Sequence, residues 1–180
     1  MPKTPRFSAG SLVRAAGLFV GGLALSLSLT ACEPTSHPGA AAVVGGQEIS
    51  ERDVTEAIDE LQPVMGQEVT RIAMVNALVA SQMYMDAASD LGIEVTEQQF
   101  NDEMAPQLEA LGADPSTLGH ASRLIFEPGL VMEYAAAAGL EHELAELAAE
   151  VPFEINPRYG SGNPLVEGMS LAEPLADSFR

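Results

Sequence analysis

The sequence predicts a mostly helical domain of about five helices, with a small antiparallel β element that joins the domain's N- and C-terminal strands. Three observations support this fold class. In residues 69–91 most polar side chains fall on one side of a helix, which leaves an apolar arc over more than half of its circumference. Short strand-like segments at 41–49 and 151–155 flank the helical part. Glycines, prolines and N-cap residues divide the helical segments from one another.

Residues 41–49 predict a small hairpin or a strand with a sharp bend. Short runs of alanine and valine precede Gly45 and Gly46, and two successive glycines suit a tight turn that needs positive φ. Ser50 then predicts the N-cap of the first helix, with Asp53 three residues later as a variant of the capping box.

The long apolar helix lies between two clear boundaries. We expect the helix before it to end at Pro63 and Gly66. Gly92 ends the apolar helix itself, and a short extended segment follows. Thr96 and Gln99 form a capping box that starts the next helix. A helix this apolar must be surrounded by other elements, so it is the expected centre of the core.

Three further helices are predicted after this restart. The third covers 97–111, where Pro106 favours a kink or an early end. An Asp-Pro pair at 114–115 supplies an N-cap and a first helical residue for the fourth helix. Glu-Pro-Gly at 127–129 predicts the end of that helix, and a fifth helix with an acidic outer face covers 130–150.

The segment at 151–155 alternates apolar residues as a half-buried strand does, and Pro152 restricts it to the edge of a sheet. Its expected partner is the strand at 43–44, which would bring the two ends of the domain together. The helical domain is therefore predicted to span 41–160. Gly, Pro and Ser recur in 161–180 without a sustained period, which predicts a disordered tail.

Charge is strongly unbalanced along the chain. The 180 residues contain 26 acidic and 8 basic side chains, for a formal net charge of −18, and no lysine follows Lys3. Such a surface repels phosphate backbones, so nucleic acid is not an expected partner. Two interpretations of the excess acid stay open, namely solubility and attraction of basic partners.

The N-terminal segment predicts a lipoprotein signal peptide at 1–31. A basic start precedes an apolar stretch that is too short and too rich in glycine for a convincing permanent span. The single cysteine, Cys32, directly follows Leu29, Thr30 and Ala31, and these three residues resemble a bacterial lipobox. In such signals the cysteine becomes the first mature residue and carries fatty acyl chains such as palmitate, and two or more chains anchor a protein stably. The alternative is an uncleaved signal anchor with an idle thiol.

Cleavage at this point would leave the lipidated cysteine and a flexible tether at 32–40. The protein would then be extracytoplasmic, anchored to the outer face of the bacterial cell membrane and part of the cell envelope.

The order of these motifs resembles the N-terminal domain of SurA-type extracytoplasmic chaperones, which are related in architecture to the PrsA foldases and to the client-holding region of trigger factor. The hairpin that leads into a capped helix resembles the opening of that domain, and LGIEVTEQQF at 91–100 resembles its helix restart. The residues at 155–160 look like the ending of short lipoproteins of this group. The resemblance covers about 41–160.

The resemblance implies a membrane-anchored chaperone or holdase that binds unfolded or newly exported polypeptides, with a preference for basic clients. Such foldases usually carry a parvulin-type isomerase domain, and the residues after Gly160 are too few for one, so no isomerase activity is expected. The alternative is an adaptor or assembly lipoprotein that holds one folded partner. Its surface would be the turn at Arg158 and Tyr159 or the acidic fifth helix. The alternative for these two residues is that they lock the exit turn against the sheet.

Methionines on the predicted helices suggest where clients would bind. Flexible thioethers line adaptable binding grooves in promiscuous binders. We therefore expect a groove between the second, third and fourth helices, with ordinary core packing as the alternative. The candidate client-binding residues are Met74, Met83, Met104 and Leu124.

Catalytic chemistry is not expected, and neither is a metal or another cofactor. The histidines His37, His120 and His142 are scattered, and the lone cysteine is assigned to lipid. His142 and Glu146 have the i, i+4 spacing of two metal ligands, but two ligands do not make a site. Gly45-Gly46 lacks the lysine and hydroxyl residue of a phosphate-binding loop.

Overall fold

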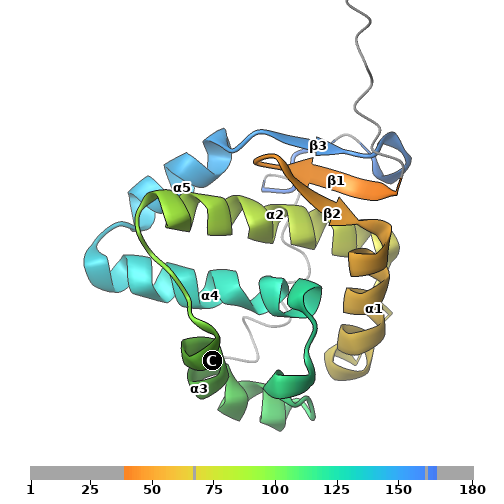
Figure 1. Cartoon of the computed structure of the whole chain (residues 1–180), viewed down its shortest axis with the longest axis horizontal. Coiled ribbons are helices and arrows are strands. Elements are labelled where there is room, and N and C mark those ends of the chain that lie inside the picture. The colour runs from red at the N-terminus through yellow and green to blue at the C-terminus, as the bar shows by residue number, and fades with distance from the viewer. Residues whose placement is uncertain (1–38, 67, 161, 166–180) are drawn as a thin grey trace, which may run out of the picture. The chain divides into compact units, whose positions relative to one another are not determined.

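The computed structural model describes residues 39–66, 68–160 and 162–165, and Figure 1 shows how the elements of this part of the chain are arranged. In chain order they are β1 (Ala40–Val44), β2 (Gln47–Ser50), α1 (Glu51–Met65), α2 (Arg71–Asp90), α3 (Glu97–Ala110), the 3-10 turn η1 (Pro115–Thr117), α4 (His120–Ala138), α5 (Glu141–Glu150), β3 (Phe153–Ile155) and the 3-10 turn η2 (Pro157–Tyr159). The described part is thus mostly helical with a small antiparallel sheet, and the predicted fold class is confirmed.

The three described strands form a sheet in the order β2-β1-β3, with both pairs antiparallel. Gly45 and Gly46 connect β1 to β2 with φ values of 56° and 85°, the positive values that a tight two-residue turn requires. Val44 lies opposite Phe153 in β3, and the N–H of Asn156 donates to the carbonyl of Ala41 over 2.9 Å. The predicted pairing of the first and last strands is therefore confirmed, with β3 at the edge.

One face of the sheet packs against the helices. Ala42 and Val44 of β1, Ile49 of β2 and Ile155 of β3 are all buried, and the register places them on the same side. The next residue along each strand points the other way, and on that side Glu48 is exposed. A sheet with one apolar face needs a single helical layer to cover it.

α1 starts where the sequence predicts it. The backbone N–H of Asp53 donates to the Ser50 hydroxyl over 3.1 Å, and the Ser50 N–H donates to the Asp53 carboxylate over 2.9 Å, which completes the capping box. The helix does not stop at Pro63 but continues to Met65 before Gly66 ends it with φ of 63°. Pro63 stands in the exposed last turn, so its missing N–H removes only one backbone hydrogen bond from the end of the helix.

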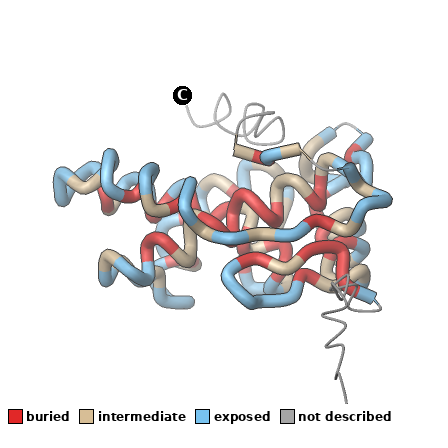
Figure 2. The backbone as a smooth tube through the Cα atoms, turned by 90° about the horizontal axis from the view of Figure 1, so that it is seen from above, coloured by how far each residue is buried: buried red, intermediate tan, exposed pale blue. Residues whose placement is uncertain are grey.

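α2 is the centre of the core, as predicted. It packs against α1, α4, α5 and β1, and about half of its residues are buried. Figure 2 marks the buried residues in red along the backbone. The Thr70 side chain caps its first turn, and Gly92 follows its last turn with φ of 71°. The Thr96 and Gln99 capping box then starts α3, which runs past Pro106 to Ala110.

The expected boundaries of the fourth and fifth helices are wrong. The Asp-Pro pair at 114–115 starts only the single turn η1, and α4 continues through Pro128 to Ala138. The break comes at Gly139, which has φ of 72°. Pro128 is buried in a helix that packs closely against α2, and this packing keeps the helix continuous although one backbone hydrogen bond is lost.

Several predictions fall on residues outside the described part. These are the signal peptide at 1–31, Cys32, most of the tether at 32–40, and 166–180 of the expected tail. Within that tail, residues 162–165 are described: Pro164 is buried and Leu165 packs against the core. The expectation of a disordered tail at 161–180 therefore stays a prediction.

Candidate functional site

The four residues expected to bind clients all lie in the core. Met74 and Met83 of α2 are 0% exposed, Met104 of α3 is 4% exposed and Leu124 of α4 is 5% exposed. They belong to one continuous apolar cluster with residues of β1, α1 and β3. They do not line an open groove, and the alternative of core packing describes them correctly.

Exposed large apolar side chains are few in the described residues. Ile72, in the first turn of α2, is 51% exposed, and Met132, in the second half of α4, is 47% exposed. They lie toward opposite ends of helices that run in the same direction (Figure 1). Two separated side chains are ordinary for a globular surface and do not form a patch.

α3 and α4 meet through a stripe of large side chains, which we call the α3–α4 interface. On α4 the i, i+3, i+4 spacing puts Arg123, Phe126, Leu130 and Tyr134 on one face. On α3 the buried residues also repeat at this spacing: Phe100, Met104 and Leu108. The apolar members all belong to the main core cluster, so this interface closes one side of the core.

Polar contacts frame the α3–α4 interface. Arg123 lies 3.5 Å from the Glu97 carboxylate, and its guanidinium stands 4.7 Å from the centroid of the Phe100 ring. Further along, the Tyr134 hydroxyl donates to Glu103 over 2.5 Å. That hydrogen bond, together with burial, raises the pKa of Tyr134 to about 12. Tyr134 therefore keeps its proton, and this bond, throughout the physiological pH range.

On the α4 side of this interface, not every buried polar group has a good partner. Glu127 pairs with Arg123 at 3.6 Å, yet burial raises the pKa of Glu127 more strongly than Arg123 and His120 lower it. Within the described residues, the Nε of Arg123 is buried at this interface without a hydrogen-bond partner. Buried unpaired polar atoms cost stability, so this contact is weaker than an apolar core of the same size.

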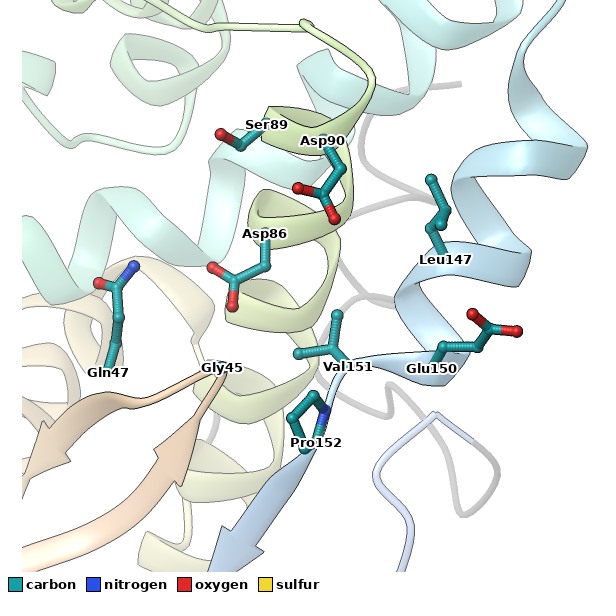
Figure 3. Close-up of a pocket in the computed structure, with 9 residues that line it drawn as sticks. All are labelled: Gly45, Gln47, Asp86, Ser89, Asp90, Leu147, Glu150, Val151 and Pro152. Atoms are coloured by element: carbon teal, nitrogen blue, oxygen red, sulfur yellow. The ribbon is translucent and has the colours of Figure 1, made fainter. Parts of the chain in front are cut away.

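A separate acidic hollow lies where the hairpin turn, the end of α2 and the end of α5 meet (Figure 3). It is open to solvent and has a volume of about 510 Å³. Three carboxylates and an apolar wall share the lining, and Figure 3 shows Asp86 and Asp90 projecting from α2 between the turn and α5. The lining residues are Gly45, Gln47, Asp86, Ser89, Asp90, Leu147, Glu150, Val151 and Pro152.

Gly45 is essential to the shape of this hollow. A Cβ at this position would stand 1.9 Å from Oδ2 of Asp86, so a side chain here would push the carboxylate away. The other oxygen, Oδ1, accepts a hydrogen bond from Gln82 Nε2 over 2.7 Å. The N–H of Gly45 donates to the carbonyl of Pro152 over 2.9 Å, which fixes the turn against the start of β3.

The arrangement suits a cationic side chain better than a metal ion. In the described part of the chain no three His, Cys, Asp or Glu side chains are placed to coordinate a metal. The carboxylates Asp86, Asp90 and Glu150 can instead attract an ammonium or guanidinium group, while Leu147 and Val151 contact its aliphatic stem.

Sequence reasoning missed this hollow. In the sequence Asp86 and Asp90 belong to the polar side of the long helix, and Glu150 to the solvated face of the fifth. Only the docking of α5 on α2 brings them together, and no local signal reports that docking. The Gly45 turn is the one part that the sequence could have indicated.

The Arg158-Tyr159 turn serves as a lock. Tyr159 donates its hydroxyl to Glu51 at the start of α1 over 2.6 Å, and Arg158 contacts the same carboxylate. Arg71 adds a third contact to Glu51 at 3.3 Å. Burial and the hydrogen bond to Glu51 raise the pKa of Tyr159. Since these side chains already bind Glu51, the locking interpretation fits them better than a partner surface does.

The remaining candidates give no site. His37 lies outside the described residues, and His120 is exposed. His142 and Glu146 approach to 3.3 Å, but both are largely exposed on α5. None of the described helices has the combination of length and apolar character needed to span a bilayer.

No family model, curated protein or solved structure matches this chain. The resemblance to SurA-type domains accordingly stays a prediction from the order of its motifs.

Proposed function

We propose that this chain is a membrane-anchored extracytoplasmic lipoprotein of the chaperone or holdase type, which binds basic segments of unfolded or newly exported polypeptides without catalysing a reaction. The acidic hollow is the observation that carries the proposal. Its three carboxylates and aliphatic wall match the two chemical parts of a lysine or arginine side chain.

The electrostatics of the described residues support a basic client. Arg71, Arg123 and Arg158 already pair with carboxylates of the same domain. The acids therefore outnumber the cations available to neutralise them, and the net charge of −18 attracts positively charged chains over about one Debye length, roughly 8–10 Å at moderate salt. Binding through such a field is expected to be fast and to weaken with salt.

Anchoring through Cys32 would place this binding site close to the membrane surface. Two or more acyl chains would hold the protein stably at the membrane, and the tether would let the domain stand roughly 15 Å away from it, as expected for a flexible linker of this length. The negative surface repels anionic lipid head groups, so the hollow would stay available to chains that emerge from the membrane.

An adaptor that holds one folded partner is the second candidate, and one observation favours it. The described residues expose only two large apolar side chains, whereas a holdase needs apolar surface for unfolded clients. Recognition through the acidic hollow and the exposed acids of α5 would suit a folded basic partner.

The test uses a soluble fragment of residues 33–180 and a fluorescently labelled, permanently unfolded basic protein. Binding measured by anisotropy is expected to be detectable at low salt and to weaken as salt rises. The hollow variant Asp86→Asn/Asp90→Asn/Glu150→Gln is expected to weaken binding by about tenfold, since each lost charge contact is worth roughly 0.5–1 kcal/mol.

A matched control removes three exposed acids elsewhere, in Glu133→Gln/Glu141→Gln/Glu143→Gln. It carries the same change in net charge, so a smaller effect assigns the binding to the hollow. Equal weakening by both triple variants would contradict a localised site. Capture of one folded protein at a fixed stoichiometry, with no affinity for the unfolded chain, would favour the adaptor.

A further inference from the structure

α3 differs from the other long helices in how it is attached. It approaches α2 and α4 less closely than α1, α4 and α5 approach α2, and large side chains fill the distance. The loops at both of its ends contain a glycine with positive φ, Gly92 at 71° and Gly112 at 82°. Glycine is the residue best able to change its φ, so these two positions are where the backbone at the ends of α3 can turn. Figure 1 shows α3 set apart from the other helices between these two loops.

The side chains beneath α3 form two matching apolar rows. Phe100, Met104 and Leu108 face inward from α3, and Phe126 and Leu130 belong to the opposing face of α4. All five are at most 5% exposed while α3 is in place. Large apolar surface is therefore present in this domain, but α3 covers it.

The polar contacts that hold α3 in place are weak ones. Glu97 is mostly exposed where it meets Arg123, and the Tyr134–Glu103 hydrogen bond also lies at the surface. In the same contact, the buried Nε of Arg123 has no partner among the described residues. Opening an interface costs less free energy when some of its buried polar atoms are unpaired than when all of them are hydrogen-bonded.

From these contacts we propose that α3 is a hinged lid over an apolar binding surface formed by Phe126 and Leu130 of α4 and the inner face of α3. The occupant is an apolar segment of an unfolded polypeptide with basic residues beside it. Opening would free the Glu97 and Glu103 carboxylates from Arg123 and Tyr134, and these acids would pair with the basic residues. The identity of the occupant rests on the proposed function, whereas the opening of α3 does not.

Thiol labelling of the full chain in lipid nanodiscs tests the opening. Met104→Cys places a thiol on the buried face of α3. Ala87→Cys places one on a buried face of α2, in a second apolar cluster that α2 forms with α4 and α5. If α3 opens while the rest stays folded, the thiol of Met104→Cys is expected to react roughly tenfold or more faster than that of Ala87→Cys, because local opening is more frequent than global unfolding. The unmodified chain supplies the background from Cys32. Equal rates at the two positions would overturn the lid.

Hydrogen exchange of the unmodified sequence keeps the test valid if a cysteine variant fails to fold. The amides of α3 are expected to exchange faster than those of α2 and α4, and Tyr134→Phe is expected to accelerate α3 alone. Tyr84→Phe is the matched control, because Tyr84 forms no hydrogen bond through its side chain in the described residues. Uniform protection of all three helices would contradict the proposal.

A synthetic peptide of leucine and arginine tests the occupant. It is expected to increase exchange in α3 without increasing it in α2, whereas a peptide with glutamate in place of arginine is expected to have no effect. If the leucine–arginine peptide leaves α3 unchanged, the assignment of the occupant is wrong. Binding of basic chains with α3 closed would preserve the proposed function and remove this inference.

Discussion

The hydroxyl of Tyr159 donates a 2.6 Å hydrogen bond to Oε2 of Glu51, a residue 108 positions earlier in the chain. Glu51 is the first residue of α1, and Tyr159 lies in the turn η2 that follows β3. The same carboxylate binds Arg71 and Arg158. One side chain therefore ties the exit of the domain to its first two helices, beside the pairing of β1 with β3.

Removing this bond is expected to weaken the fold. Tyr159→Phe should lower the free energy of unfolding by about 1 kcal/mol, the usual effect of losing a hydrogen bond to a charged group at a partly exposed site. Glu51→Gln should cost more, because it also removes the charge that binds two arginines. Urea unfolding of the 33–180 fragment measures both. If Tyr159→Phe behaves like the control Tyr84→Phe, the lock contributes nothing to stability.

The two glycines of the hairpin turn are expected to differ in their tolerance of a side chain. Both have positive φ, but only Gly45 has the Asp86 carboxylate within 1.9 Å of its Cβ direction, while Gly46 has no atom within 4 Å. Gly46→Ala should cost about 1 kcal/mol for the backbone conformation, and Gly45→Ala about 1–3 kcal/mol more. Thermal unfolding compares them, and Asp86→Ala should relieve part of the Gly45→Ala defect. Equal costs at both glycines would show that the carboxylate does not press on the turn.

Glu127 is expected to destabilise the domain at neutral pH. Burial raises its folded pKa above the unfolded value of about 4.5, so folding favours the protonated form. This contribution to stability is present below the unfolded pKa and is lost as pH rises through the folded pKa. Glu127→Gln should therefore raise the free energy of unfolding at pH 7 by about 0.5–1 kcal/mol, a typical size for a single substitution.

The advantage of Glu127→Gln should shrink as pH falls toward the unfolded pKa of 4.5, because folded Glu127, with its raised pKa, takes up its proton before the unfolded chain does. Denaturant titrations at a series of pH values follow this difference. Exposed Glu133→Gln is the control and should change stability little at any pH. A loss of stability in Glu127→Gln at pH 7 would mean that the contact with Arg123 outweighs the burial of the charge.

Lipidation is predicted to occur at Cys32. Expression in a bacterial host with labelled palmitate should give a labelled, membrane-bound product whose mature sequence begins at Cys32, and Cys32→Ser should abolish the label. Thr30→Ser keeps the hydroxyl of the lipobox and should still be labelled. An unlabelled wild-type chain, or a mature N-terminus elsewhere, would contradict the anchor.

Local signals predicted much of the fold. Ser50 with Asp53 and Thr96 with Gln99 form their capping boxes as expected, because each box depends only on residues three positions apart. The turn at Gly45-Gly46 follows in the same way from the φ values that glycine allows. The pairing of β3 with β1 was predicted because two short strand-like segments flank the helical part, and each is the other's available partner.

What could not be predicted depends on packing between distant segments. Pro128 is an ordinary helix-ending signal, and only the contact of α4 with α2 keeps that helix continuous. Met74 and Met83 have the same periodicity whether they line a groove or fill a core, so the sequence could not predict that they are buried. The acidic hollow likewise exists because Asp86 and Glu150, far apart in the chain, end up at one turn.

The central claim is that this domain holds unfolded basic polypeptides. Light scattering tests it most directly, with the 33–180 fragment added in several-fold excess to a basic protein diluted from denaturant. Aggregation of the basic client is expected to be suppressed at low salt, and less so at high salt or with the Asp86→Asn/Asp90→Asn/Glu150→Gln variant. An acidic client of similar size is expected to gain little protection. Unchanged aggregation of the basic client at every ratio would show that the domain does not hold unfolded basic chains.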